Sequence, residues 1–199
     1  MKKLILTSCG IVNDKLKDNF YTLINKPSAD LKLLYITTAV DGEQNQDLSW
    51  VDKEYQTILD LGIKKENITE FKLDHNINFR DFDAIYMMGG NTFYLLKKLR
   101  ENNWAEKIKK ALEQGIIYIG SSAGSIIMGS SIKTALGYDE NQVKLTNLDG
   151  LELVNGLVIP HANQKQDFIE KCKNEFNEKL YIIEDNHGFI INNDNENYY

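Results

Sequence analysis

The strongest chemical signal in the sequence is a serine with glycine on both sides, in Gly120-Ser121-Ser122-Ala123-Gly124. This G-x-S-x-G pattern lies between an apolar run and a short helical pattern, which is the context that a nucleophile elbow requires. On so sharp a turn the hydroxyl points outward, and the residues two positions away must be nearly free of side chains. Ser121 is the other candidate nucleophile, but only Ser122 has a glycine two positions before it and another two positions after it. The pattern also fits a turn that packs a helix on its strand or cradles an anion.

A serine nucleophile needs a base, and the sequence has three histidines. His161 follows the apolar run 157–159 and Pro160, so we expect it at the carboxyl end of a strand, on the same sheet edge as Ser122. His187 lies in a turn-like segment, 185–188, and His75 lies in a polar loop. We therefore expect His161 to be the base, although a strand-end histidine can also be purely structural.

An acid that orients the imidazole is expected between Ser122 and His161. The segment leaves three carboxylates open, Asp139, Glu140 and Asp149. The order serine, acid, histidine is acceptable because catalytic triads occur in several chain orders. Each of these carboxylates also fits a solvated loop or turn.

A second glycine-rich turn, Gly89-Gly90-Asn91-Thr92, follows the apolar run 84–88. Without a Cβ, Gly90 lets its backbone N–H approach a ligand closely, so it is a candidate oxyanion donor beside the N–H of Ala123. Asn91 is a candidate substrate contact, and Thr92 is a candidate helix cap. A tight turn with a cap is the alternative interpretation.

Short apolar runs alternate with amphipathic segments along the chain, which indicates strands covered by helices. Residues 188–192 are expected to pair with 181–184 as an antiparallel edge hairpin. The pattern predicts one α/β domain over residues 1–199, with a mostly parallel sheet, helices on both faces and ligands bound at the carboxyl ends of the strands. The expected strands are 4–7, 33–38, 68–73, 84–88, 116–119, 157–159 and 181–184, and the expected helices are 12–24, 48–61, 92–100, 104–114, 125–129 and 167–176.

Composition narrows the classes of function. The 199 residues include 29 acidic and 23 basic side chains, for a net charge of −6, which argues against a nucleic-acid binder or an anionic-membrane binder. No apolar run approaches the roughly 18 residues of a spanning helix, and dinucleotide and P-loop motifs are absent. Cys9 and Cys172 lack metal-ligand spacing and are expected to be free thiols. We expect a cytoplasmic monomer or homodimer without cofactor or metal.

Three segments together resemble the dipeptidase E (aspartyl dipeptidase) family of serine peptidases, which are relatives of cyanophycinase. They are MGGNTFYLL at 88–96, YIGSSAG at 118–124, and Pro160-His161. The resemblance covers most of the chain. It implies a three-layer, flavodoxin-like α/β sandwich similar to class I glutamine amidotransferases, with serine in place of the elbow cysteine. It also implies Ser122 as nucleophile, His161 as general base, and the N–H groups of Gly90 and Ala123 as oxyanion hole.

The same resemblance places the acid between elbow and histidine. Counting back from His161 gives Asp139, whereas counting forward from Ser122 gives Gly137, so Asp139 requires a two-residue insertion. Aspartyl dipeptidases also carry an arginine shortly after the histidine, but residues 162–167 contain none. Lys165 there can supply only a point charge, not a bidentate clamp on an aspartyl carboxylate.

We therefore expect a serine peptidase that cleaves short peptides, dipeptides included, and the missing arginine argues against strict specificity for an N-terminal aspartate. Two alternatives stay open at this point. One is a cyanophycinase-like or other amide hydrolase on the same scaffold. The other is a non-catalytic relative that keeps the elbow as a small-molecule site.

Overall fold

The structure is a computed structural model that describes residues 2–44, 47–193 and 195–199. Its strands are β1 (Lys3–Thr7), β2 (Leu33–Ile36), β3 (Ile68–Phe71), β4 (Ala84–Met87), β5 (Ile117–Ser121), β6 (Leu157–Ile159), β7 (Leu180–Ile182), β8 (Gly188–Asn192) and β9 (Asn195–Tyr198). Its helices are α1 (Asp14–Ile24), α2 (Ser49–Leu59), α3 (Thr92–Glu101), α4 (Trp104–Glu113), α5 (Ala123–Ile126) and α6 (Gln166–Glu175).

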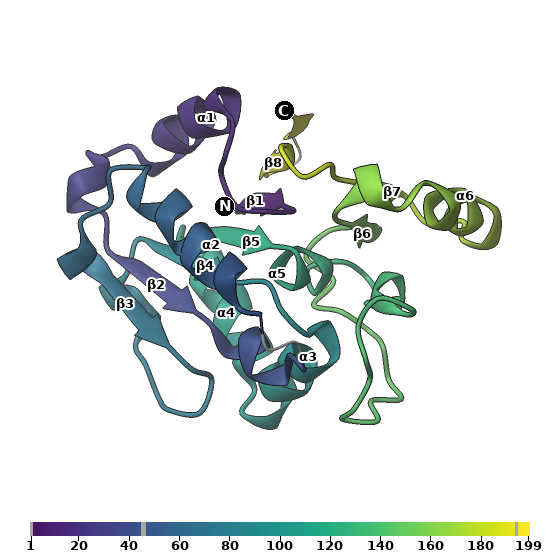
Figure 1. Ribbon diagram of the computed structural model, residues 1–199. Coiled ribbons are helices and arrows are strands. Elements are labelled where there is room, and N and C mark those ends of the chain that lie inside the picture. The colour runs from purple at the N-terminus through teal and green to yellow at the C-terminus, as the bar shows by residue number, and fades with distance from the viewer. Residues whose placement is uncertain (1, 45–46, 194) are drawn as a thin grey trace.

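The main sheet has the strand order β3-β2-β4-β5-β1-β8-β9 (Figure 1). The five strands from β3 to β1 are parallel, while β8 runs antiparallel to β1, and β9 antiparallel to β8. Strands β2, β4 and β5 are buried along their whole length, as expected for parallel strands covered on both faces. The mostly parallel α/β sheet predicted from the sequence is confirmed.

Helices cover both faces of this sheet, and each face has its own apolar core. Helices α1 and α2 pack on one face through side chains such as Phe20 and Ile58. Helices α3, α4 and α5 pack on the other face through Phe93, Ile108 and Ile126. None of the helices in the described ranges is long and apolar enough to cross a membrane. The result is three layers, helix, sheet and helix, with a sheet edge at which all parallel strands end.

The C-terminal pairing differs from the expected hairpin of 181–184 with 188–192. Strand β7 instead pairs in parallel with β6, in a separate two-stranded sheet beside the main one (Figure 1). The antiparallel hairpin is formed by β8 and β9. The physical reason is that β8 buries Ile190 and Ile191 against β1, so it belongs to the main sheet. The segment 183–187 is therefore a crossing between two sheets.

The connection from β5 to α5 is unusually close to its neighbours. A Cβ added at Gly124 would lie 2.1 Å from the carbonyl oxygen of Met87 in β4. One added at Gly120 would lie 2.7 Å from the carbonyl oxygen of Gly124. Both distances are far inside van der Waals contact, so both positions require glycine. The two glycines of the elbow motif thus let α5 pack directly on the sheet edge.

This close packing predicts the effect of adding one methyl group. We expect Gly124→Ala to lower the free energy of unfolding by about 3 kcal/mol, because backbone must move to relieve the overlap. Gly137→Ala is the matched control, since a Cβ there meets no atom within 4 Å and only its positive φ of 86° is unfavourable; it should cost about 1 kcal/mol. Urea unfolding of both variants measures this, and equal losses would contradict the packing argument.

Candidate active site

Ser122 occupies a backbone conformation that an ordinary residue rarely adopts. Its φ is 47° and its ψ is −110°, a combination that is sterically strained for a residue with a Cβ. The strain is held by a hydrogen bond from Ser122 N–H to Thr7 O of β1, at 3.0 Å, and by α5 beginning at the next residue. The hydroxyl is half-buried and faces a cavity. The predicted nucleophile elbow is therefore present as geometry.

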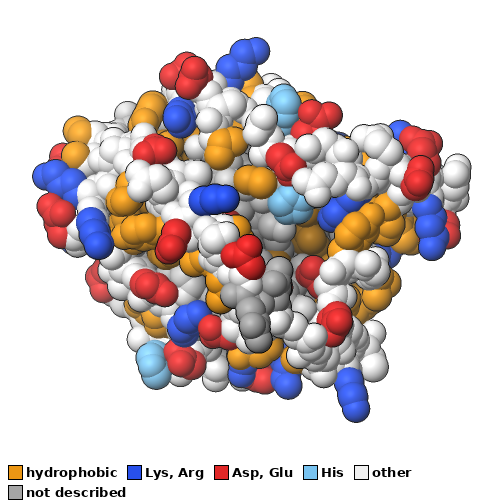
Figure 2. All heavy atoms as spheres, in the orientation of Figure 1, with side chains coloured by type: hydrophobic (Ala, Val, Ile, Leu, Met, Phe, Trp, Pro, Cys, Tyr) orange, Lys and Arg blue, Asp and Glu red, His pale blue; other side chains and the backbone are white. Residues whose placement is uncertain are grey.

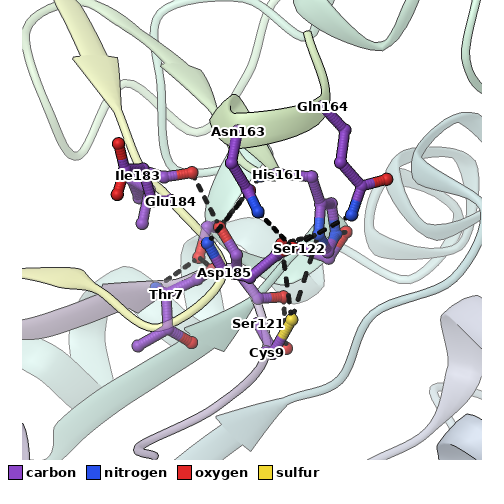
Figure 3. A network of polar contacts seen from close by, with 12 residues as sticks. Thr7, Cys9, Ser121, Ser122, His161, Asn163, Gln164, Ile183, Glu184 and Asp185 are labelled. Carbon is purple, nitrogen blue, oxygen red and sulfur yellow. Dashed lines mark hydrogen bonds and ion pairs between the residues drawn. The ribbon is translucent and has the colours of Figure 1, made fainter. Parts of the chain in front are cut away.

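His161 lies two residues beyond β6 and brings its ring to this hydroxyl. Its Nε2 is 3.0 Å from Ser122 Oγ (Figure 3). The residue has a φ of 57°, and its N–H donates to Ser8 Oγ at 2.9 Å. Ser8 in turn donates that hydroxyl to Ile183 O, at 2.9 Å. The buried Ser8 thereby ties the histidine to the segment that follows β7.

The carboxylate on the other side of the imidazole is Asp185. Its Oδ1 is 2.7 Å from His161 Nδ1, and its Oδ2 accepts from Asn163 Nδ2 and Gln164 Nε2, both at 3.0 Å (Figure 3). Burial alone would raise the pKa of Asp185, but the hydrogen bonds from His161, Asn163 and Gln164 outweigh it. The net effect holds this pKa below its ordinary value, so the carboxylate is ionised at neutral pH.

The three carboxylates considered from the sequence lie elsewhere. Asp139 lines the cavity, but its Oδ2 accepts the N–H of Thr92 at 2.8 Å, at the start of α3. The backbone oxygen of Glu140 accepts a hydrogen bond from the Asn91 amide. The backbone oxygen of Asp149 accepts one from the Arg100 guanidinium. The expectation that Asp139 orients His161 is thus corrected by the geometry, which puts Asp185 there instead.

The position of Asp185 follows from the pairing of β6 with β7, once that pairing is known. Strands β6 and β7 are parallel and in register, with Ile159 opposite Ile182. Parallel neighbours end at the same edge, so a residue shortly after β7 lies beside a residue shortly after β6. The expected hairpin of 181–184 with 188–192 places Asp185 in a turn and away from His161. The parallel pairing of β7 with β6 brings the two residues together.

The candidate oxyanion donors also lie at the sheet edge. Gly90 lines the cavity with a φ of 129°, and a Cβ there would lie 2.5 Å from the backbone of Ala39. Ala123 is the first residue of α5, directly after Ser122. Asn91 is buried and caps α3 by accepting from Tyr94 N–H, and its amide donates to Glu140 O. Its side chain is therefore engaged in holding loops rather than lining the cavity.

The cavity in front of Ser122 has a volume of about 600 Å³. Figure 2 shows this face, where a histidine lies in a hollow with acidic and basic side chains around it. Lys165 lines one wall, with Nζ 4.0 Å from the ring centre of Tyr138, and burial lowers its pKa. Glu43 also lines the cavity, and burial followed by the charge of Asp139 raises its pKa. The cavity thus offers both signs of charge to a ligand.

Two further polar groups line the cavity beside the triad geometry, Cys9 and Glu54. The Sγ of Cys9 lies 3.9 Å from His161 Nδ1 and 3.7 Å from Asp185 Oδ1. Burial, and then the charge of Asp185, raise the pKa of this thiol to about 12, so it is neutral at physiological pH. Together the three side chains place potential metal-ligand atoms within 4.8 Å of one another.

Glu54 is a buried carboxyl group at the base of the site. Tyr86 donates its hydroxyl to Oε1 at 2.9 Å, and the Ser121 hydroxyl and the Gly89 N–H also hydrogen-bond to this carboxylate. These bonds lower the pKa of Glu54, but burial dominates and raises it from 4.5 to about 7. A carboxyl group that binds its proton this tightly makes stability depend on pH.

The sign of that dependence follows from proton uptake. Between about pH 4.5 and pH 7 the folded protein holds the Glu54 proton while the unfolded chain has lost it, so stability falls as pH rises, by about 3 kcal/mol over this window. Glu54→Gln stays neutral and should lack this fall. Urea unfolding across the window tests it, with exposed Glu66→Gln as control; parallel curves for wild type and Glu54→Gln would contradict it.

Comparison with known proteins identifies the family of this chain. The sequence profile of Peptidase family S51 matches residues 4–198. A peptidase of Listeria monocytogenes is 30% identical over 151 residues, which cover 71% of this chain and 74% of that protein. Peptidase E of Haemophilus influenzae is 34% identical over 114 residues, which cover 55% of this chain and 50% of that protein.

Solved structures have the same architecture. A Listeria monocytogenes protein described as a peptidase E matches with a TM-score of 0.84 and 26% identity, over 100% of this chain and 98% of that one. A peptidase from an acI-B1 actinobacterium, 20% identical, shares the fold with a TM-score of 0.69, over 100% of this chain and 87% of that one. The resemblance to dipeptidase E relatives is confirmed: the chain belongs to peptidase family S51 and is a serine-type peptidase.

Proposed function

We propose that Ser122, His161 and Asp185 form the catalytic triad of this peptidase, and that it hydrolyses short peptides through an acyl-enzyme. The observation that carries the proposal is the continuous contact from Ser122 Oγ to His161 Nε2, at 3.0 Å, and from His161 Nδ1 to Asp185 Oδ1, at 2.7 Å. A nucleophile and base within hydrogen-bond reach, with the base oriented by a third group, is the arrangement that activates a serine.

Acylation begins when His161 Nε2 takes the proton from Ser122 Oγ as the oxygen attacks the peptide carbonyl carbon. The C–O bond forms and the carbonyl π electrons move to the oxygen. His161 then gives the proton to the leaving nitrogen, the C–N bond breaks, and the first product departs as an amine. In the second half a water attacks the ester carbonyl carbon while His161 takes its proton. The bond between that carbon and Ser122 Oγ then breaks, Oγ receives the proton from His161, and the carboxylic acid product leaves.

Asp185 acts on this cycle through His161. By accepting from Nδ1–H it fixes the tautomer that leaves Nε2 free to accept a proton, and its charge stabilises the imidazolium that forms. The bonds from Asn163 and Gln164 hold its second oxygen, so the carboxylate has little freedom to turn away.

The developing oxyanion requires donors that are already in place. The N–H groups of Gly90 and Ala123 are the candidates, since Gly90 lies in the turn after β4 and lines the cavity, and Ala123 directly follows Ser122. A Cβ at Gly90 would overlap the backbone of Ala39, so this turn at the cavity wall requires glycine.

The proposed substrate class follows from the cavity. A volume of about 600 Å³ accommodates a ligand of drug size, which corresponds to a peptide of a few residues. Neither arginine lines the cavity: Arg100 binds Asn147 and Asp149, and Arg80 contacts Gln114. Lys165 and Lys53 are lysines that line it, and they supply point charges rather than a bidentate clamp.

The triad is tested with a fluorophosphonate probe, which reacts with activated serines. We expect the wild type to be labelled and Ser122→Ala to be unlabelled. Asp185→Asn should slow labelling about 10³- to 10⁴-fold, because the tautomer of His161 is lost. Asp139→Asn is the matched control: its amide oxygen still accepts from Thr92, so labelling should slow less than about tenfold.

Two outcomes would contradict the assignment. Labelling of Ser122→Ala at the wild-type rate would show that Ser122 is not the nucleophile. A larger effect of Asp139→Asn than of Asp185→Asn would indicate that Asp139, and not Asp185, is the acid of the triad.

The substrate class is tested with a panel of X-Leu dipeptides, together with isopeptides and simple amides. We expect dipeptide hydrolysis that Ser122→Ala abolishes. The kcat/KM values for Asp-Leu and Ala-Leu should differ by less than about tenfold. Lys53 and Lys165 share the cavity with Glu43 and Asp139, so their net attraction for an aspartyl carboxylate is about 1 kcal/mol. Hydrolysis of the amides or isopeptides alone would favour another amide hydrolase on this scaffold, and a strong Asp-Leu preference would contradict the cavity argument.

A further inference from the structure

The proposed peptidase cycle gives no role to Cys9, although its thiol contacts both His161 and Asp185. Cys9 lies two residues beyond β1 and is half-buried at the cavity wall. Its Sγ is within 3.9 Å of His161 Nδ1 and 3.7 Å of Asp185 Oδ1. Thiol, imidazole and carboxylate therefore converge on one point, from three segments that are far apart in the sequence (Figure 3). We propose that Cys9 Sγ, His161 Nδ1 and Asp185 Oδ1 form a reversible zinc site that switches the enzyme off.

The separations of these atoms are close to those of a zinc centre. Tetrahedral zinc with bond lengths of about 2.3 Å to sulfur and about 2.0–2.2 Å to nitrogen and oxygen spaces its ligand atoms about 3.3–3.6 Å apart. The observed separations are 3.9, 3.7 and 2.7 Å. Opening the His161–Asp185 contact by roughly 0.6 Å and moving the thiol inward by roughly 0.2–0.4 Å brings the three atoms to these separations. Such shifts need only small side-chain rotations.

The donor set selects among metals. One sulfur and one imidazole nitrogen favour Zn²⁺ over Mg²⁺ or Ca²⁺, which prefer oxygen ligands throughout. The surroundings support the ligands: Asp185 Oδ2 is fixed by Asn163 and Gln164, which leaves Oδ1 for the metal. Three protein ligands leave the fourth position to water, on the side of the open cavity.

Zinc binding changes the protons in a defined way. The Cys9 thiol loses its proton to solvent, because only the thiolate is a ligand. The imidazole stays neutral, and its proton moves from Nδ1 to Nε2 as Nδ1 binds the metal. Nε2 then donates to Ser122 Oγ and cannot accept its proton. Asp185 also exchanges its hydrogen bond with the imidazole for a bond to the metal. Ser122 therefore loses its base, and His161 loses the carboxylate that orients it. This inhibitory effect rests on the proposed triad; the binding itself does not.

Binding is tested without turnover, by titrating the purified protein with Zn²⁺ in a calorimeter and with Co²⁺ in a spectrophotometer. We expect one high-affinity zinc per chain with release of about one proton, and a thiolate-to-cobalt absorption band. Cys9→Ser, which preserves the shape of the side chain, should lose the band and bind zinc at least about tenfold more weakly. Cys172→Ala is the matched control, since Cys172 lies apart in α6, and it should behave as wild type.

Inhibition is tested on the same variants with a dipeptide substrate. Zinc should stop hydrolysis by the wild type and by Cys172→Ala, and a chelator should restore it. Measured against its own zinc-free rate, Cys9→Ser should need at least about tenfold more zinc for the same fractional inhibition. Equal zinc sensitivity of Cys9→Ser and wild type, or no thiolate band, would overturn the metal site. A band that depends on Cys9 in a protein without peptidase activity would instead overturn the proposed function.

Discussion

The active centre depends on how closely α5 approaches the sheet. At Gly124 the backbone comes so near to Met87 O of β4 that even a methyl group has no room. That approach forces the chain to reverse within one residue, and Ser122 takes up the reversal with a φ of 47°. The strained conformation is thus a consequence of packing, and the core that holds α5 in place also supplies the energy that holds the serine outward.

The second half of the site is carried by a separate unit, and Ser8 joins the two halves. His161 and Asp185 follow β6 and β7, which form their own small sheet, whereas Ser122 follows β5 in the main sheet. The buried hydroxyl of Ser8 accepts from His161 N–H and donates to Ile183 O. Because Ser8 directly follows β1, a displacement of the small sheet relative to the main sheet would break both bonds. Ser8 therefore links the position of His161 directly to the end of the first strand, and Tyr181 of β7, which donates to Glu196 of β9, ties the small sheet to the main sheet at a second point.

Local patterns made much of this predictable from the sequence. The glycines around Ser122 and at Gly90 mark close approaches that only glycine tolerates, and the position of His161 after an apolar strand places it at the correct edge. Asp185 was beyond the same reasoning for a physical reason. Its segment has the composition of a turn, and whether 181–184 pairs with β6 or with 188–192 depends on burial of Ile190 and Ile191 against β1. Such long-range pairing leaves no local trace, and the same is true of Cys9 and Glu54, whose importance lies only in what they contact.

Two carboxyl groups at the site, Asp185 and Glu54, have pKa values that their surroundings shift in opposite directions. Asp185 has a pKa below its ordinary value because its partners include the imidazole, whose positive charge it stabilises. Glu54 has only neutral donors, so burial dominates and its pKa rises to about 7. Glu54 is hydrogen-bonded to Gly89 and Ser121, the neighbours of Gly90 and Ser122, so its negative charge, when present, lies close to the proposed oxyanion position. Near neutral pH Asp185 is therefore ionised, whereas Glu54 exchanges between its protonated and ionised forms. A fall in pH thus removes negative charge beside Ser122 and leaves the charge beside the imidazole in place.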